Sequence, residues 1–212
     1  MLILSLLSTP YILIGLFLSL IIGITIHEFS HAYMANKLGD PTAKKMGRLS
    51  LNPLRHLDPF GTIFLLLVGF GWGKPVIYNP DYLRHGRKDE LKIAIAGPIS
   101  NFICAFIFAL PYRITHYLNV DFSANPFFII CAVITEINII LAVFNLIPIP
   151  PLDGSKFIFL FVSENLRHEL ERIGPLILMG LIFIIYILRL NVFGVIFTPI
   201  VEWLLNFTRT FP

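Results

Sequence analysis

Hydrophobic residues are grouped along the chain into long blocks that alternate with short polar segments. Three blocks lie at about 10–36, 91–117 and 126–148, and a fourth begins near Gly174 and continues through LILMGLIFIIYIL. Each approaches the roughly 20 residues that an α-helix needs to cross the hydrocarbon core of a bilayer. Polar residues interrupt the last apolar stretch, which predicts either one span with an interfacial helix or a hairpin of two short spans. We therefore predict an all-α polytopic membrane protein with about four to five transmembrane helices.

A shorter apolar piece at 60–72 is rich in glycine and is followed by Lys74 and Pro75. At about 1.5 Å per residue, a helix of this length does not reach comfortably across the bilayer. Irregular backbone is tolerated at membrane depth only where protein or a water-filled cavity covers it. The flanking segments 47–53 and 74–79 have the pattern of short strands bounded by turn residues. We expect a short re-entrant or β-hairpin element between the first and second spans.

Basic residues lie on both sides of this short piece. They are Lys37, Lys44, Lys45, Arg48 and Arg55 before it, and Lys74, Arg84, Arg87, Lys88 and Lys92 after it. If residues 60–72 re-enter the membrane, all these cations lie on one face, as the positive-inside rule favours for the cytoplasm. We therefore expect the N-terminus outside and both basic loops in the cytoplasm. The formal net charge of +3 is then a topology signal and does not indicate nucleic-acid binding.

The composition excludes an ordinary soluble domain, since 56% of the residues are hydrophobic, 14% are charged and the mean hydropathy is +0.80. Cys104 and Cys131 have no CxxC spacing, and we expect them to pack as small apolar residues. No internal repeat, linker or low-complexity segment divides the chain, which predicts a single integral membrane domain over residues 1–212. The start of the sequence lacks the basic residues of a cleaved signal peptide, and no organelle address is present. We expect a prokaryotic inner membrane.

Ionisable residues interrupt the first block near its C-terminal end, in the sequence His27-Glu28-Phe29-Ser30-His31. Such residues are costly inside a membrane span, and a functional site is their default interpretation. On an α-helix, His27 and His31 lie one turn apart on the same face, with Glu28 beside them. This is the HExxH pattern, in which two histidines hold zinc while the glutamate handles the proton of a bound water.

A catalytic zinc ion usually has three protein ligands and a water, so a third ligand is needed. Asp153 is the stronger candidate, because it follows three helix-breaking prolines in NLIPIPPLDG and precedes Gly154, which lets the chain turn close to a ligand. The alternative is a loop that merely leaves the membrane, with Asp153 as a helix N-cap. Glu136, inside the third block, is the rival ligand, and its alternative role is hydrogen bonding to neighbouring helices.

Three segments together resemble the signatures of the site-2 protease family, which are intramembrane zinc metalloproteases. They are HEFSH, the sequence AGPISN at 96–101 and NLIPIPPLDG at 145–154, and their order and placement match over residues 10 to about 160. The resemblance is to the compact form of the family without a PDZ domain. It implies one Zn²⁺ per chain on His27, His31 and Asp153, with Glu28 as general base. It also associates Asn145 and Asn101 with the catalytic centre, although both amides could simply form interhelical hydrogen bonds.

The resemblance further implies hydrolysis of peptide bonds in transmembrane protein substrates, with the active site towards the cytoplasmic side and the catalytic core within about 10–160. An exposed strand edge in the re-entrant region could hold an unwound substrate by β-addition, or could simply close the cytoplasmic face. The alternatives are a catalytically silent scaffold of the same fold and a membrane metal transporter, although the chain lacks the repeated halves typical of transporters. The membrane HExxH enzymes that cut prenylated proteins would require a glutamate as third ligand.

Overall fold

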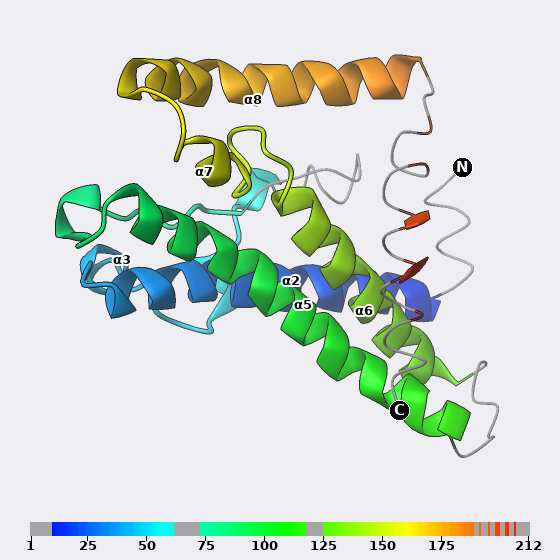
Figure 1. The fold of residues 1–212 in the computed structure, drawn as a ribbon. Helices are drawn as coiled ribbons and strands as arrows, with labels where there is room; N and C mark the ends of the chain where they lie inside the picture. Colours follow the sequence, from blue (N-terminus) through cyan, green and yellow to red (C-terminus); the bar gives the residue numbers. More distant parts are fainter. Residues whose placement is uncertain are drawn as a thin grey trace.

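The computed structural model describes residues 10–61, 73–117 and 125–188, together with residues 191, 195, 198–199, 202–203 and 206. Its centre is a bundle of three long helices that pack pairwise against one another (Figure 1). They are α2 (Pro10–Lys37), α5 (Arg87–Tyr117) and α6 (Pro126–Asn145). Three segments, namely all of α2, Arg87–Pro111 of α5 and all of α6, are long and apolar enough to cross a membrane. They confirm three of the predicted spans.

Small residues let these helices approach closely, which is typical of packing inside membranes. A Cβ atom added to Gly15 of α2 would lie 2.9 Å from the Val133 side chain of α6. One added to Gly23 would lie 2.8 Å from Leu141, on the same pair of helices. Between α5 and α6, the buried Ala105 packs against Ile139. The two glycines thus allow α2 and α6 to approach closely, and Gly23 does so one helical turn before His27.

The predicted fourth span corresponds in part to α8 (Glu164–Ile187). This helix begins with charged residues, and only its second half has the apolar sequence expected of a span. It lies apart from the three-helix bundle, beyond the short helix α7 (Ser155–Ile158) (Figure 1). Within the described residues only α2, α5 and α6 qualify as membrane spans, so the expected total of four to five is not confirmed.

The polar segment between α2 and α5 contains three short helical turns, α3 (Thr42–Lys45), η1 (Pro53–Arg55) and η2 (Pro80–Tyr82). The buried Asp40 holds this segment together, because its carboxylate accepts hydrogen bonds from the backbone of Thr42 and Asn79 at 2.9 and 2.7 Å. Leu57 and Gly73 form an isolated antiparallel bridge, and the described part of the chain contains no strand. Most of the expected re-entrant piece, at 62–72, lies outside the described residues. The re-entrant or hairpin element therefore stays a prediction.

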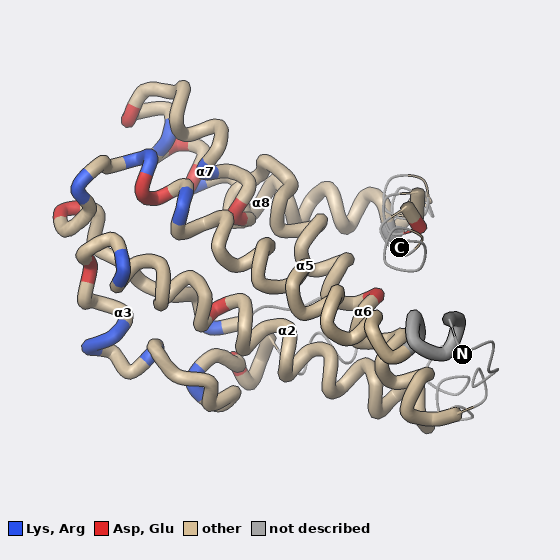
Figure 2. The backbone as a smooth tube through the Cα atoms, turned by 60° about the horizontal axis from the view of Figure 1, so that its bottom comes forward, with Lys and Arg blue, Asp and Glu red and all other residues tan. Residues whose placement is uncertain are grey.

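Charged residues gather at one end of the bundle. Figure 2 shows the Lys, Arg, Asp and Glu positions concentrated around α3, α7 and the beginning of α5, whereas the middle of the three long helices is almost free of them. A charged end next to long apolar helices is the distribution expected for a protein whose helices pass from an aqueous phase into lipid.

Candidate metal centre

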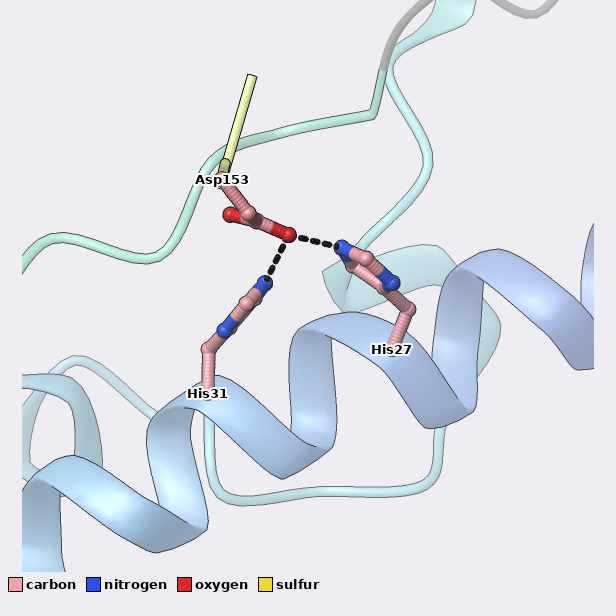
Figure 3. A group of neighbouring side chains, drawn as sticks. All are labelled: His27, His31 and Asp153. Carbon is pink, nitrogen blue, oxygen red and sulfur yellow. Dashed lines mark ion pairs between the residues drawn. The ribbon is translucent and has the colours of Figure 1, made fainter. Parts of the chain in front are cut away.

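One helix and one loop bring three ligand side chains together (Figure 3). His27 and His31 project from successive turns of α2, and Asp153 reaches them from the loop between α6 and α7. The Oδ2 atom of Asp153 lies 3.1 Å from Nε2 of His27 and 3.3 Å from Nε2 of His31. Both histidines are buried and Asp153 is half-buried. This is the geometry of a site for a metal ion.

The loop that carries Asp153 folds back because Gly154 has no side chain. Its backbone N–H donates to the carbonyl of Asn145 at 2.7 Å, at the end of α6. A Cβ atom on Gly154 would overlap the carbonyl of Leu146, so every other residue would push the loop away from the helix end. The proline run and the glycine therefore work together: the prolines end α6, and the glycine returns Asp153 to the bundle.

Hydrogen bonds to the far side of each imidazole fix which nitrogen carries the proton. Nδ1 of His31 lies 2.7 Å from the carbonyl oxygen of Ile93, which can only accept, so this nitrogen is the protonated one. A neutral His31 consequently directs the lone pair of Nε2 towards Asp153. Orienting a metal-binding histidine through its other nitrogen is a general property of such sites.

His27 is oriented by a chain of buried amides that joins all three long helices. The Nδ2 group of Asn101 donates to Asn138 Oδ1 at 2.9 Å and to the carbonyl of Gly23 at 3.2 Å, which leaves its Oδ1 as an acceptor. This Oδ1 lies 2.6 Å from His27 Nδ1 and takes the proton of that nitrogen. The Nδ2 group of Asn138 in turn donates to the carbonyl of Ile134 at 2.8 Å. The amide assignments follow from this network, and they leave His27 Nε2 as a second lone pair facing Asp153.

When both imidazoles are neutral, two Nε2 lone pairs and a carboxylate oxygen thus converge. Apart from its two close approaches to the Nε2 atoms, the buried Oδ2 of Asp153 has no hydrogen-bond partner among the described residues. Ligand atoms about 2.0–2.1 Å from a tetrahedral zinc ion lie about 3.3 Å from one another, and the two distances to Oδ2 agree with this edge. The donor set of two nitrogens and one oxygen suits zinc, and three ligands leave a fourth position open. The residues present therefore fit a catalytic zinc ion.

Gly97 of α5 faces the two ligand imidazoles. A Cβ atom at this position would lie 2.5 Å from Nε2 of His31 and 2.6 Å from Cε1 of His27. A glycine inside a membrane span is typical of close packing between helices. The structure shows that the close contact is with the two ligand rings themselves, so a side chain at Gly97 would displace them.

Glu28 lies beside the ligands and contacts the segment that precedes η2. Its Oε2 accepts a hydrogen bond from the backbone N–H of Val76 at 3.1 Å. A Cβ atom on Gly73 would lie 3.7 Å from its Oε1. Glu28 is therefore outside the ligand group, and its carboxylate is held by residues 73–76. No sequence pattern indicated this contact, because it depends on how the loop folds.

The remaining candidates occupy different places. The side-chain amide of Asn145 donates a hydrogen bond to the carbonyl of Leu141 in its own helix at 2.9 Å. Glu136 is exposed on α6 and does not belong to the metal group. Asn138, by contrast, was not singled out from the sequence, although it is completely buried and completes the network that orients His27. A lone asparagine inside an apolar span was the signal that could have found it.

An ion-pair cluster anchors the chain that follows Asp153. Arg167 of α8 donates to both carboxylate oxygens of Glu90 at 3.1 and 2.7 Å, and Tyr78 donates to Glu90 at 3.0 Å. Lys156 of α7 pairs with Glu171 at 3.0 Å, and Arg167 also reaches Glu171 at 3.3 Å. We call these five residues the ion-pair cluster. It connects α7 and α8 with the start of α5 and with the segment near Glu28.

The environment of the ion-pair cluster shifts the pKa of Tyr78 and the pKa of Glu171. Burial raises the pKa of the Tyr78 hydroxyl, and the adjacent Glu90 carboxylate raises it further. Burial alone would raise the pKa of Glu171, but the hydrogen bond from Lys156 and its charge outweigh this effect, and the pKa is lowered. Tyr78 therefore stays a hydrogen-bond donor and Glu171 stays charged near neutral pH.

A model of peptidase family M50 matches residues 15–118 and 111–188, which together contain every residue of the metal centre. The chain belongs to peptidase family M50. This confirms the resemblance to the site-2 proteases. In Bacillus subtilis strain 168, the protein named "Putative zinc metalloprotease YwhC" is 41% identical over 169 residues, which cover 77% of this chain and 74% of that protein. No solved structure is a significant match to the chain.

More distant M50 relatives carry similar names. "Putative zinc metalloprotease Rip2" of Mycolicibacterium smegmatis is 25% identical over 94% of this chain and 77% of its own length. "Zinc metalloprotease MJ0392" of Methanocaldococcus jannaschii is 24% identical over 71% of this chain and 35% of its own length. Membership of M50 and the three apolar helices together make the chain an integral membrane protein of a zinc metalloprotease family.

Proposed function

We propose that this M50 protein is an intramembrane zinc metalloprotease of the site-2 type, which hydrolyses peptide bonds of membrane-spanning substrates. The observation that carries the proposal is the convergence of the Nε2 atoms of His27 and His31 on the buried Oδ2 atom of Asp153, at 3.1 and 3.3 Å. The next residue along α2 from His27 is Glu28, a carboxylate that ligates nothing. A metal transport site would need the three ligands but has no use for this glutamate.

Each residue then has a distinct role. His27, His31 and Asp153 would hold one Zn²⁺, which when bound supplies Lewis-acid activation of a water molecule and of the substrate carbonyl. Glu28 accepts the proton of the attacking water and passes it to the leaving amine. The Val76 N–H holds the Glu28 carboxylate in place for this transfer.

The two asparagines act differently from each other in this proposal. All hydrogen-bonding capacity of the Asn101 amide group is directed at protein partners, so Asn101 positions His27 and does not touch substrate. Asn145 has one amide hydrogen on its own helix, and a direct role in holding the substrate backbone requires the side chain to turn towards the centre.

The substrate and the membrane side are also part of the proposal. A transmembrane substrate enters laterally between the helices and unwinds, because helical carbonyls are already hydrogen-bonded. The metal centre is at the charged half of the bundle, and basic residues favour the cytoplasmic side of a prokaryotic inner membrane (Figure 2). Water reaches the centre from this side.

The test is cleavage of a model single-span substrate by the protein reconstituted in liposomes, with bound zinc measured in the same samples. We expect Glu28→Gln to abolish cleavage and to retain zinc, because the ligand atoms are untouched. Glu136→Gln is the matched control, since it neutralises an exposed carboxylate on α6, and it should retain both properties. Absence of zinc from the wild-type protein would contradict the metalloprotease, and full cleavage by Glu28→Gln would contradict the role of this residue. Bound zinc without cleavage of any tested substrate would favour the silent scaffold.

A further inference from the structure

A cavity of about 470 Å³ opens between residues 46–55, which follow α3, and Lys74. The described residues that line it comprise three cations, one amide and two apolar side chains, and none of them is acidic: Met46, Arg48, Asn52, Leu54, Arg55 and Lys74. Within the part of the chain that the structure describes, none of the three cations forms an ion pair with a carboxylate. The cavity therefore presents uncompensated positive charge.

Apolar side chains protrude around the same cavity. Leu54 in its lining is 77% exposed, and nearby Leu51 and Phe60 are 64% and 78% exposed. This segment follows the end of α2, a helix long and apolar enough to cross the membrane. Cations combined with protruding apolar residues at a helix end are typical of chain that lies in the membrane interface, with the apolar groups among acyl chains. The cations are then at the depth of lipid phosphates.

The cavity is also connected to Glu28 through the backbone. The guanidinium of Arg48 donates to the carbonyl of Arg55 and, at 3.5 Å, to that of Pro75. The backbone N–H of Lys74 donates to the carbonyl of His56 at 2.7 Å. Two residues after Lys74, the N–H of Val76 holds Glu28. An anion bound by these cations would therefore hold Lys74, two residues before the Val76 N–H that contacts Glu28.

We propose that this cavity binds the phosphate of an anionic phospholipid, and that the bound lipid holds residues 74–76 where Val76 contacts Glu28. The binding itself is independent of the proposed protease activity, whereas the effect on Glu28 rests on it. Lys and Arg side chains near a membrane surface each strengthen binding to anionic lipid by about fivefold. Two cations lost together should weaken it by about 10- to 30-fold.

The experiment measures retained lipid without requiring cleavage. The protein is reconstituted in phosphatidylcholine with or without phosphatidylglycerol, extracted into mild detergent, and its bound lipids are counted by native mass spectrometry. The test variant is Arg55→Gln/Lys74→Gln, which leaves the structural hydrogen bonds of Arg48 in place. The matched control is Arg84→Gln/Lys88→Gln, which removes two exposed cations outside the cavity. Arg55→Lys/Lys74→Arg keeps the charge and should restore retention.

The wild type and the control should retain phosphatidylglycerol, and the test variant should lose it. Equal retention by all variants overturns the site. Displacement of phosphatidylglycerol by inorganic phosphate at similar concentration overturns the lipid as the source of the anion. Once cleavage has been established with the Glu28→Gln comparison, phosphatidylglycerol should raise the wild-type cleavage rate and leave that of the test variant unchanged. A rate that is independent of lipid in the wild type overturns the effect on Glu28 while the binding result stands.

Discussion

The metal centre and the ion-pair cluster hold the same stretch of chain from its two sides, but they satisfy their polar groups in opposite ways. In the ion-pair cluster each carboxylate meets cationic or hydroxyl donors, as with Glu90 between Arg167 and Tyr78. In the metal centre, neutral imidazoles present two Nε2 lone pairs beside the Asp153 carboxylate, and their N–H donors point away to Asn101 and Ile93. A buried cluster that contains both cations and carboxylates neutralises its own charge. Buried acceptor atoms alone require a cation from outside the chain. The difference separates a structural anchor from a site that binds a ligand.

The largest effect should come from removing the charged ligand. In Asp153→Ala, two neutral imidazoles remain, and we expect zinc affinity to fall by more than the roughly 10- to 100-fold that is typical of changes behind the ligands. Cleavage should disappear with the metal. The measurement is zinc content after equilibration in metal buffers, with Glu136→Ala as the control that keeps its zinc. Normal zinc content in Asp153→Ala would show that Asp153 does not bind the zinc ion together with the two histidines.

Breaking the ion-pair cluster should affect stability and not the metal. Arg167 is only 12% exposed, and Arg167→Met leaves Glu90 with Tyr78 as its remaining donor. We expect a loss of about 3 kcal/mol in the free energy of unfolding, the lower end for a broken buried pair. Chemical denaturation in detergent measures this loss. The double variant Arg167→Met/Glu90→Gln should recover part of it, because the unpaired charge is gone. A parallel fall in the zinc affinity of the folded protein would contradict the independence of the two regions.

A smaller effect is expected from a residue that acts through a ligand. Asn101→Ala removes the acceptor behind His27, so its imidazole is free to change tautomer, and Asn138 loses a donor. We expect zinc affinity to fall by about 10- to 100-fold. Competition with a chelator of known affinity measures the change. Asn101→Asp, which keeps an acceptor towards His27, should retain more affinity than Asn101→Ala. The reverse order would mean that Asn101 serves only helix packing.

The smallest effect is expected at the exposed ion pair between Arg87 and Glu164, beside the ion-pair cluster. Glu164 receives two hydrogen bonds from Arg87, and the one at 2.6 Å is the shorter. The hydrogen bond and charge of Arg87 lower the pKa of Glu164. Its side chain is 58% exposed, and exposed pairs contribute little to stability. We expect Glu164→Gln to leave zinc content and the denaturation midpoint unchanged within error. A clear loss of stability would show that Glu164 contributes to stability as the members of the ion-pair cluster do.

The sequence predicted those features that depend on a local period or a backbone restriction. The separation of His27 and His31 by four positions places them on one helix face wherever the helix lies. The prolines and glycine around Asp153 dictate a return of the chain. By contrast, the hydrogen bond between Asn101 and Asn138 and the contact of Gly97 with the imidazoles depend on how α2, α5 and α6 cross. Such crossings follow from packing over whole helices, which no single segment encodes.

The same distinction applies to the predicted fourth span. Hydropathy favoured a span after Gly174, but it carries no information about the ion pairs of Arg167 and Glu171. These pairs connect the start of α8 with α5 and α7. The fourth span and the re-entrant piece at 62–72 remain predictions.

The ligands of the metal centre are far apart along the chain, and this has a consequence for biosynthesis. A nascent chain that has inserted only α2 carries two imidazoles and lacks the carboxylate, so it holds zinc weakly. The third ligand arrives only after α5 and α6 have been synthesised and the loop behind them has left the ribosome. Completion of the ligand set is thereby coupled to synthesis of all three long helices.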